Sequence, residues 1–212
     1  MEKLKVGVLI SGGGSNLQAL IDACVQPNFP AEIIHVISNI PDVYGLTRAK
    51  NAGIPTTVIS HKDFADRESF DENIHKAFTN AGVEFICCAG FMRIMTDKLI
   101  NGWPDKMINI HPSLLPKYKG LHTHQRALDA GDDLAGCTIH FVRVALDDGP
   151  LIMQASVPIH KGDDAEILSA RVISQEHIIY PQALKLIAEG GVKIEGAKTI
   201  INGKTGPVKI AG

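Results

Sequence analysis

The sequence has few of the features that mark membrane, nucleic-acid-binding or metal-stapled proteins. Its apolar runs are of strand length, well short of the roughly 20 residues that a membrane-spanning helix needs, and the run after Lys5 is too short for a signal peptide. Twenty-one Lys and Arg against 23 Asp and Glu give a formal charge of −2, which argues against a protein that wraps nucleic acid. The four cysteines include no C-x-x-C pair, so they predict neither a zinc site nor a redox pair. We therefore expect a cytoplasmic protein without nucleic-acid or membrane partners.

The sequence does contain a regular alternation of short apolar runs and longer amphipathic stretches. This alternation is typical of a doubly wound α/β domain, a mostly parallel sheet with helices on both faces. We expect strands at 4–10, 32–38, 56–59, 84–89, 107–110, 137–144 and 151–157, and helices at 16–24, 44–52, 67–80, 124–130 and 164–188. Pro181 should kink or divide the last helix, and Asn202-Gly203 predicts a hairpin. The prediction is one domain over 1–212, with a core at about 4–188 and a C-terminal β-hairpin at about 192–210.

A glycine-rich turn, Ser-Gly-Gly-Gly-Ser-Asn at 11–16, joins the first strand to the first helix. Its glycines permit a tight turn and leave the amides at the helix start pointing outward, where they can bind an anion. Leu17 stands where a dinucleotide fingerprint has its third glycine, and no Gly-Lys-Ser/Thr follows, so nicotinamide cofactors and ATP are disfavoured. A smaller phosphate, such as a sugar monophosphate, needs only the loop amides with Ser15 and Asn16. The alternative is that Ser15 or Asn16 merely caps the helix.

Asn109 and His111 alternate with apolar residues at the end of the fifth predicted strand. A period of two places both side chains on one face, and Pro112 fixes the exit loop at the carboxyl end of the sheet. An amide donor beside an imidazole can hold a carbonyl oxygen as it becomes an oxyanion. Asp147, in the turn 147–150, would raise the pKa of His111 by favouring the imidazolium. The alternative makes Asn109 and His111 ordinary strand-end residues and Asp147 a turn former.

Three further histidines, His122, His124 and His140, belong to the same stretch of the chain. The spacing of the first two resembles that of metal ligands, but no nearby carboxylate or cysteine repeats a ligand spacing. We expect no metal, and interpret these histidines as loop contacts or as neighbours of the His111 imidazole.

Five segments stand out along the chain: Gly-x-Gly-Ser-Asn at 12–16, Ala-Gly-Phe-Met-Arg-Ile at 89–94, Asn-Ile-His-Pro-Ser-Leu-Leu-Pro at 109–116, Gly-Leu-His-Thr-His at 120–124 and Gln-Glu-His at 175–177. Together they resemble the phosphoribosylglycinamide formyltransferase family of purine synthesis, from about Val6 to Ala188. The resemblance implies a Rossmann-like formyltransferase fold. It also implies that the formyl group of 10-formyltetrahydrofolate, a co-substrate, passes to the amine of glycinamide ribonucleotide through a tetrahedral intermediate.

The resemblance implies residue roles as well. His111 would be the proton donor, with Asn109 and Asp147 completing the catalytic set and Asp147 raising the pKa of His111. Four residues would hold the ribonucleotide: Gly14, Ser15, Asn16 and Glu176. Six would line the folate site: Arg67, Met92, Arg93, Ile94, Met95 and Asn109. The partners would be these two small molecules, with no metal, and a homodimer is compatible with the resemblance.

Two positions depart from the family pattern. Gly13 stands where Asn is common, but that position is variable and the phosphate role of the loop should survive. Asp148 adds a second acid to the usual Asp-x-Gly-Pro, which leaves open whether Asp147 or Asp148 faces His111.

Three alternative functions share part of this pattern. Formyltetrahydrofolate hydrolase usually has a regulatory domain in front, whereas the first strand here begins at Leu4. Methionyl-tRNA formyltransferase has a second domain for tRNA, and a chain of charge −2 lacks that grip. A phosphate sensor using the glycine loop alone would leave Asn109, His111 and Asp147 without a joint purpose.

Overall fold

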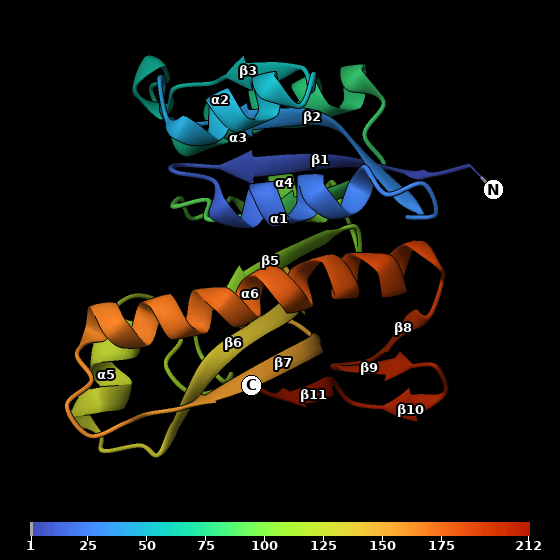
Figure 1. The fold of residues 1–212 in the computed structure, drawn as a ribbon. Helices are drawn as coiled ribbons and strands as arrows, with labels where there is room; N and C mark the ends of the chain where they lie inside the picture. Colours follow the sequence, from blue (N-terminus) through green and yellow to red (C-terminus); the bar gives the residue numbers. More distant parts are fainter. Residues whose placement is uncertain (1) are drawn as a thin grey trace. The chain divides into compact units, whose positions relative to one another are not determined.

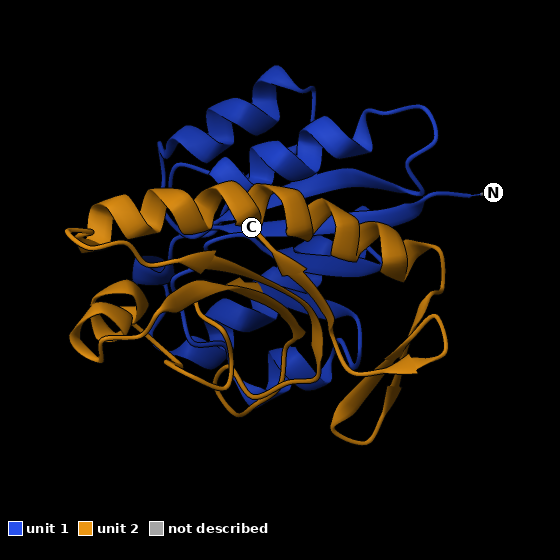
Figure 2. Ribbon diagram, turned by 60° about the horizontal axis from the view of Figure 1, so that its bottom comes forward, with its two compact units in different colours: residues 1–109 blue, residues 110–212 orange. Residues whose placement is uncertain are grey.

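The computed structural model describes residues 2–212 and divides after Asn109 into two compact units (Figure 2). Strand β5 (Met107–His111) spans the division. The expectation of one domain over the whole chain stays a prediction, because a division by contacts does not show whether either unit folds alone.

The first unit is a parallel sheet with the strand order β3-β2-β1-β4-β5 (Figure 1). Besides the start of β5, its strands are β1 (Leu4–Ile10), β2 (Ala31–Ser38), β3 (Thr56–Val58) and β4 (Phe85–Cys88). Its helices are α1 (Ser15–Cys24), α2 (Tyr44–Asn51), α3 (Arg67–Ala81) and α4 (Asp97–Asn101), with a 3-10 turn at His61–Asp63.

The strand order reverses once in this unit. The chain runs outward from β1 through β2 to β3 and then returns to β4 on the other side of β1. Right-handed crossovers therefore place α1 beside α2 on one face and α3 beside α4 on the other. The reversal makes the carboxyl ends of β1 and β4 a switch point, the place where open α/β sheets bind ligands.

The apolar character of β1 explains its central position. Residues 6–10 are fully buried, as expected for a strand covered by helices on both faces. Gly7 allows the closest approach, because a Cβ there would lie 2.5 Å from the Phe78 ring of α3. On the other face, α1 buries one apolar stripe at helical spacing, formed by Leu17, Leu20, Ile21 and Cys24. The turn between β1 and α1 is thus held at both ends by buried elements.

The second unit combines an antiparallel pair with a long helix. Its elements are α5 (Thr123–Asp129), β6 (Leu134–Phe141), β7 (Leu151–Pro158), α6 (Ala165–Ala188), β8 (Val192–Glu195), β9 (Lys198–Ile201), β10 (Lys204–Thr205) and β11 (Val208–Ala211). Strands β6 and β7 are antiparallel, β11 joins β7 in parallel, and α6 packs on β6 and β7. Strands β8, β9 and β10 form a small separate antiparallel sheet.

The predicted fold class is confirmed, with local differences. Helix α4 and the turn at His61–Asp63 were not expected, because five and three residues are too few for a periodic signal. Pro181 does not divide α6, which continues to Ala188. The hairpin between β9 and β10 is confirmed, and Asn202 and Gly203 both have positive φ (49° and 82°), as its tight turn requires. Among residues 2–212, no helix is long and apolar enough to cross a membrane.

Candidate active site

The end of β5 places His111 beside a carboxylate. His111 Nδ1 lies 3.4 Å from Asp147 Oδ2, and both side chains are only 7% exposed. The other ring nitrogen, Nε2, lies 2.9 Å from the Tyr118 carbonyl oxygen. Because a carbonyl can only accept, Nε2 carries a proton, and Nδ1 faces Asp147 with a second proton only when the ring is an imidazolium. The ring is thus held between a backbone carbonyl and a carboxylate.

The turn after β6 decides which acid faces His111. Asp147 has a positive φ of 49°, and its Oδ2 accepts a hydrogen bond from the Gly120 amide at 2.9 Å. Gly149 is required there, since a Cβ would lie 1.7 Å from the Phe141 carbonyl oxygen. Asp148 instead points to the surface with 56% of its side chain exposed, where it pairs with Lys119. The structure therefore assigns the His111 contact to Asp147.

A second imidazole contacts the same carboxylate. His140 Nε2 lies 3.6 Å from Asp147 Oδ1, and its Nδ1 lies 2.9 Å from the Phe141 carbonyl oxygen. That carbonyl places the single proton of a neutral ring on Nδ1, so Nε2 offers Asp147 a lone pair. Burial lowers the pKa of His140, with the charges of His111 and Lys119 acting in the same direction and Asp147 opposing them. The sequence pointed to His140 only as one of two options, a loop contact or a neighbour of His111.

The two histidines of segment 120–124 differ in environment. His122 is exposed, has a φ of 58° and is the N-cap of α5. His124 is half-buried, and burial, followed by the nearby His111, lowers its pKa. Its Nδ1 has no hydrogen-bond partner within the part of the chain that the structure describes. No group of three or more His, Cys, Asp or Glu among residues 2–212 is arranged to hold a metal ion.

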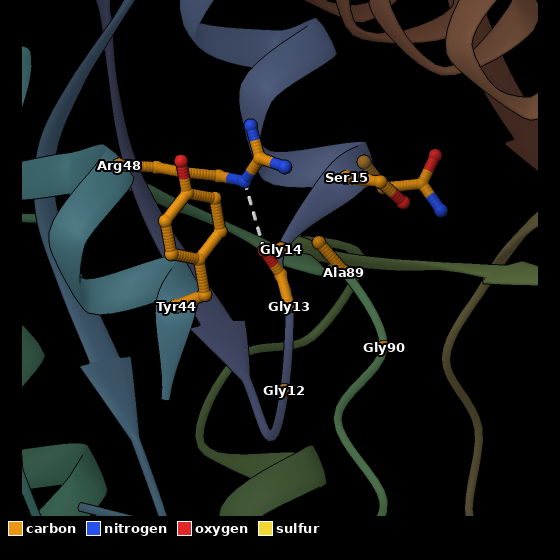
Figure 3. Close-up of a pocket in the computed structure, with 9 residues that line it drawn as sticks. Gly12, Gly13, Gly14, Ser15, Tyr44, Arg48, Ala89 and Gly90 are labelled. Atoms are coloured by element: carbon orange, nitrogen blue, oxygen red, sulfur yellow. Dashed lines mark hydrogen bonds between the residues drawn. The ribbon is translucent and has the colours of Figure 1, made fainter. Parts of the chain in front are cut away.

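The glycine-rich turn of the first unit borders a pocket of about 310 Å³ (Figure 3). The lining residues come from the turn, from α2 and from the end of β4: Gly12, Gly13, Gly14, Ser15, Asn16, Tyr44, Arg48, Ala89 and Gly90. The pocket therefore lies at the carboxyl ends of β1 and β4, where the strand order reverses.

The N-cap of α1 is Gly14, with a left-handed φ of 70° and no side chain to accept a hydrogen bond. The alternative in which Ser15 or Asn16 caps this helix is therefore wrong. Gly45 of α2 packs against the turn and donates its amide to the Gly12 carbonyl at 3.1 Å. A Cβ on Gly14 would lie 2.8 Å from the Gly45 Cα, so this close approach requires glycine. The arrangement leaves the first amides of α1 as the polar edge of the pocket, suited to an anion.

The chain is similar to known proteins of one family. The model of the formyl transferase family matches residues 4–184. The chain belongs to the formyl transferase family. It is 45% identical to phosphoribosylglycinamide formyltransferase of Haemophilus influenzae over 96% of both chains. The solved structure of the phosphoribosylglycinamide formyltransferase of Coxiella burnetii superposes with a TM-score of 0.93 at 43% identity, covering 99% of this chain and 100% of that one.

Longer relatives contain the same region as one part. The trifunctional purine biosynthetic protein adenosine-3 of Chironomus tentans is 52% identical over 91% of this chain, which covers 14% of that protein. The chain spans between 14% and 20% of the length of the trifunctional relatives it matches. This formyl transferase thus corresponds to a single segment of those larger proteins.

Five of the six residues expected to bind folate lie on two segments of the first unit of this formyl transferase, and the sixth, Asn109, lies on β5. Arg67 begins α3, and segment 92–95 follows β4, with Met92 69% and Ile94 63% exposed. The Met92 amide donates to Ser11 Oγ at 2.8 Å, which ties this segment to the end of β1. Exposed methionine and isoleucine side chains beside two arginines suit a ligand with an apolar ring and a carboxylate.

One residue in this region was missed by sequence reasoning. Asp71 of α3 is buried, and its Oδ2 accepts a hydrogen bond from the Thr96 amide at 2.6 Å. Burial raises the pKa of this carboxyl, while the Thr96 contact and the charges of Arg67 and Arg93 lower it. Asp71 therefore links the two predicted folate segments. A buried acid on the apolar stripe of a helix was the available signal, since such positions are rarely charged without a partner.

Glu176 lies in the second unit, on α6, where it is buried. The glycine turn lies in the first unit, so the prediction that they share one ribonucleotide stays a prediction. Asn109 is two residues before His111 in β5, and the alternation of the strand puts both side chains on one face.

Proposed function

We propose that this formyl transferase moves the formyl group of 10-formyltetrahydrofolate to the amine of glycinamide ribonucleotide, in purine biosynthesis. The observation that carries the proposal is the buried His111–Asp147 pair, with 3.4 Å between Nδ1 and Oδ2. It occurs in a chain that is 45% identical to a phosphoribosylglycinamide formyltransferase over 96% of both chains. The trifunctional relative named above is a purine biosynthetic protein by its name, and the glycine turn offers the phosphate site that a ribonucleotide needs.

The reaction needs alignment, charge stabilisation and one proton transfer. The amine nitrogen bonds to the formyl carbon, the carbon–nitrogen bond to the folate breaks, the amine loses a proton and the folate nitrogen gains one. Protonated His111 gives a proton to the folate nitrogen and takes up the proton that the amine loses, while Asn109 stabilises the oxyanion of the tetrahedral intermediate. Asp147 holds the imidazolium in place, because its Oδ2 is 3.4 Å from Nδ1 and is itself fixed by the Gly120 amide. These steps require no covalent enzyme intermediate.

The proposed binding roles are those that the family resemblance implies. The turn residues Gly14, Ser15 and Asn16, with Glu176, hold the ribonucleotide, and the turn takes the phosphate. Arg67 with the segment 92–95 and Asn109 hold the folate, which enters as co-substrate. We propose that the protein uses no metal, works in the cytoplasm and has these two small molecules as its partners. It would act as a monomer or as a homodimer.

The test is an assay of purified protein with 10-formyltetrahydrofolate, with and without glycinamide ribonucleotide. Deformylation of the folate and formation of the formylated amine are followed together. We expect deformylation only when the amine is present, equal to product mole for mole.

Two other results would contradict the proposal. Deformylation without the amine would indicate hydrolysis of formyltetrahydrofolate. The absence of any deformylation, combined with binding of the ribonucleotide, would indicate a phosphate sensor.

A further inference from the structure

We propose that Arg48 determines the specificity of this site for a phosphorylated amine substrate, by supplying the charge of the phosphate subsite and holding the glycine turn in its binding conformation. The inference rests on the proposed function and adds to it a residue outside the motifs that the sequence singled out. Arg48 lies on α2, beyond the glycine turn in the sequence, and lines the 310 Å³ pocket.

Charge is the first reason. A phosphate monoester carries about −1.5 to −2 charge near pH 7. Of the nine described residues that line the pocket, eight are uncharged and Arg48 alone is cationic. Backbone amides and the hydroxyl of Ser15 can donate hydrogen bonds, but they bring no net positive charge to offset the phosphate. A guanidinium is suited to this task because its planar donors match phosphate oxygens.

The position of the guanidinium is the second reason. Arg48 Nε donates to the Gly13 carbonyl at 2.8 Å, and one terminal nitrogen donates to Gln18 Oε1 at 3.2 Å. The Tyr44 ring covers the guanidinium at 4.7 Å from its centroid. Figure 3 shows the group over the turn, between Tyr44 and Ser15. Three contacts, one each from the turn, α1 and α2, thus hold the cation at the pocket edge, so little side-chain freedom is lost when an anion binds.

The bond to Gly13 has a further effect on the turn. The Gly13 carbonyl belongs to the peptide whose amide is that of Gly14, so fixing the carbonyl also orients the neighbouring amide. A Cβ on Gly13 would meet no atom within 4 Å, so no group packs against that side of the residue. The Arg48 hydrogen bond is therefore a direct restraint on this peptide.

The test compares two substrates that differ only in the phosphate, glycinamide ribonucleotide and its dephosphorylated riboside. The variants are Arg48→Met, which removes the charge and the hydrogen bonds, and Arg48→Lys, which keeps the charge. Lys50→Met is the matched control, because Lys50 is an exposed cation of the same helix that does not line the pocket.

Arg48→Met should lower kcat/KM for the ribonucleotide by about 10- to 100-fold through KM, the loss expected for one charge-assisted contact. The kcat for the ribonucleotide and kcat/KM for the riboside should stay within about 3-fold. Arg48→Lys should recover part of the loss, and Lys50→Met should match the parent protein with both substrates. Equal losses with both substrates, or no loss with the ribonucleotide, would overturn the proposal.

A binding measurement separates this proposal from the proposed function. Thermal unfolding is followed with ribose 5-phosphate, with ribose, and without ligand, at one ionic strength. Ribose 5-phosphate should raise Tm of the parent and of Lys50→Met, but not of Arg48→Met, even if the parent transfers no formyl group. If ribose 5-phosphate gives the same Tm shift with Arg48→Met, or none with the parent, the inference is wrong.

Discussion

The glycine turn of the first unit and the histidine cluster of the second unit use opposite means to handle charge. The turn presents backbone amides and one fixed arginine to an open pocket. Its Gly14 lacks a side chain, which permits the close approach of α2. In the cluster, His111, Asp147 and His140 are buried. Backbone carbonyls determine which ring nitrogen of each histidine carries a proton in the neutral form. Under the proposed function, recognition at the turn depends on backbone conformation and on the Arg48 charge, whereas chemistry at the cluster depends on proton positions. Substitutions should separate these two dependences.

The largest effect is expected at the cluster. His111→Ala should lower kcat about 1000-fold, because it removes the only proposed proton donor. The Tm shift produced by ribose 5-phosphate should be unchanged, since the turn does not depend on His111. His122→Ala is the control, an exposed histidine nearby in the sequence, and should keep full activity. Loss of the ligand-induced Tm shift in His111→Ala would show that the two regions are not separable.

Replacing the two adjacent acids tests the assignment to Asp147. Asp147→Asn should lower kcat about 100-fold, because the amide cannot hold the imidazolium as an ion pair. Asp148→Asn should stay within about 2-fold, since an exposed ion pair with Lys119 contributes little. The measurement is kcat at saturating substrates near pH 7. A larger loss in the Asp148 variant would reverse the assignment.

The packing of α2 against the glycine turn should be sensitive to added side-chain bulk at Gly45. In Gly45→Ala the new Cβ would lie 2.6 Å from Ile10 Cδ1 and 2.9 Å from the Gly12 carbonyl oxygen, so the turn must move. We expect a loss of about 1 to 3 kcal/mol in the free energy of unfolding by urea. Gly13→Ala is the control, with open space at its Cβ. Equal stability of the two variants would contradict this account of the packing.

The smallest effect concerns pH. Burial holds the pKa of folded His140 below the ordinary 6.5, so the unfolded chain binds more protons below that pH. The contribution of His140 is therefore complete above pH 6.5 and is lost as pH falls through the folded pKa. One such group gives a slope of at most about 1.4 kcal/mol per pH unit.

Urea unfolding at a series of pH values below 6.5 measures this slope. It should be reduced in His140→Gln and unchanged in His122→Gln, which alters an exposed histidine. The slope that remains in His140→Gln should include His124 and His35, whose pKa values burial also lowers. An unchanged slope in His140→Gln would show that His140 is not buried in its neutral form.

Particular elements show where the sequence was informative. Strand β1 matched its predicted bounds, Leu4–Ile10, because the five-residue apolar run at 6–10, followed by a glycine-rich turn, is typical of the first strand of an α/β protein. Helix α4 was missed because five residues carry no period, and the pairing of β11 with β7 was missed because it joins segments far apart in the chain. At the site, the identity of His111 and Asp147 was predicted, but the choice between Asp147 and Asp148 was not, since adjacent acids in a turn have the same local pattern.

The sequence by itself determined the alternation of elements and the glycine turn after β1, and it indicated the residue types of the proposed catalytic set, because these depend on local periodicity and motif. Only the tertiary structure decided that Gly14 caps α1, that Asp147 rather than Asp148 meets His111, and that His140 and Arg48 belong to the two regions. Each of those depends on contacts between distant segments, such as the 2.8 Å bond from Arg48 to Gly13. Local pattern sets what a segment can form, and burial against other segments sets which of its polar groups face one another.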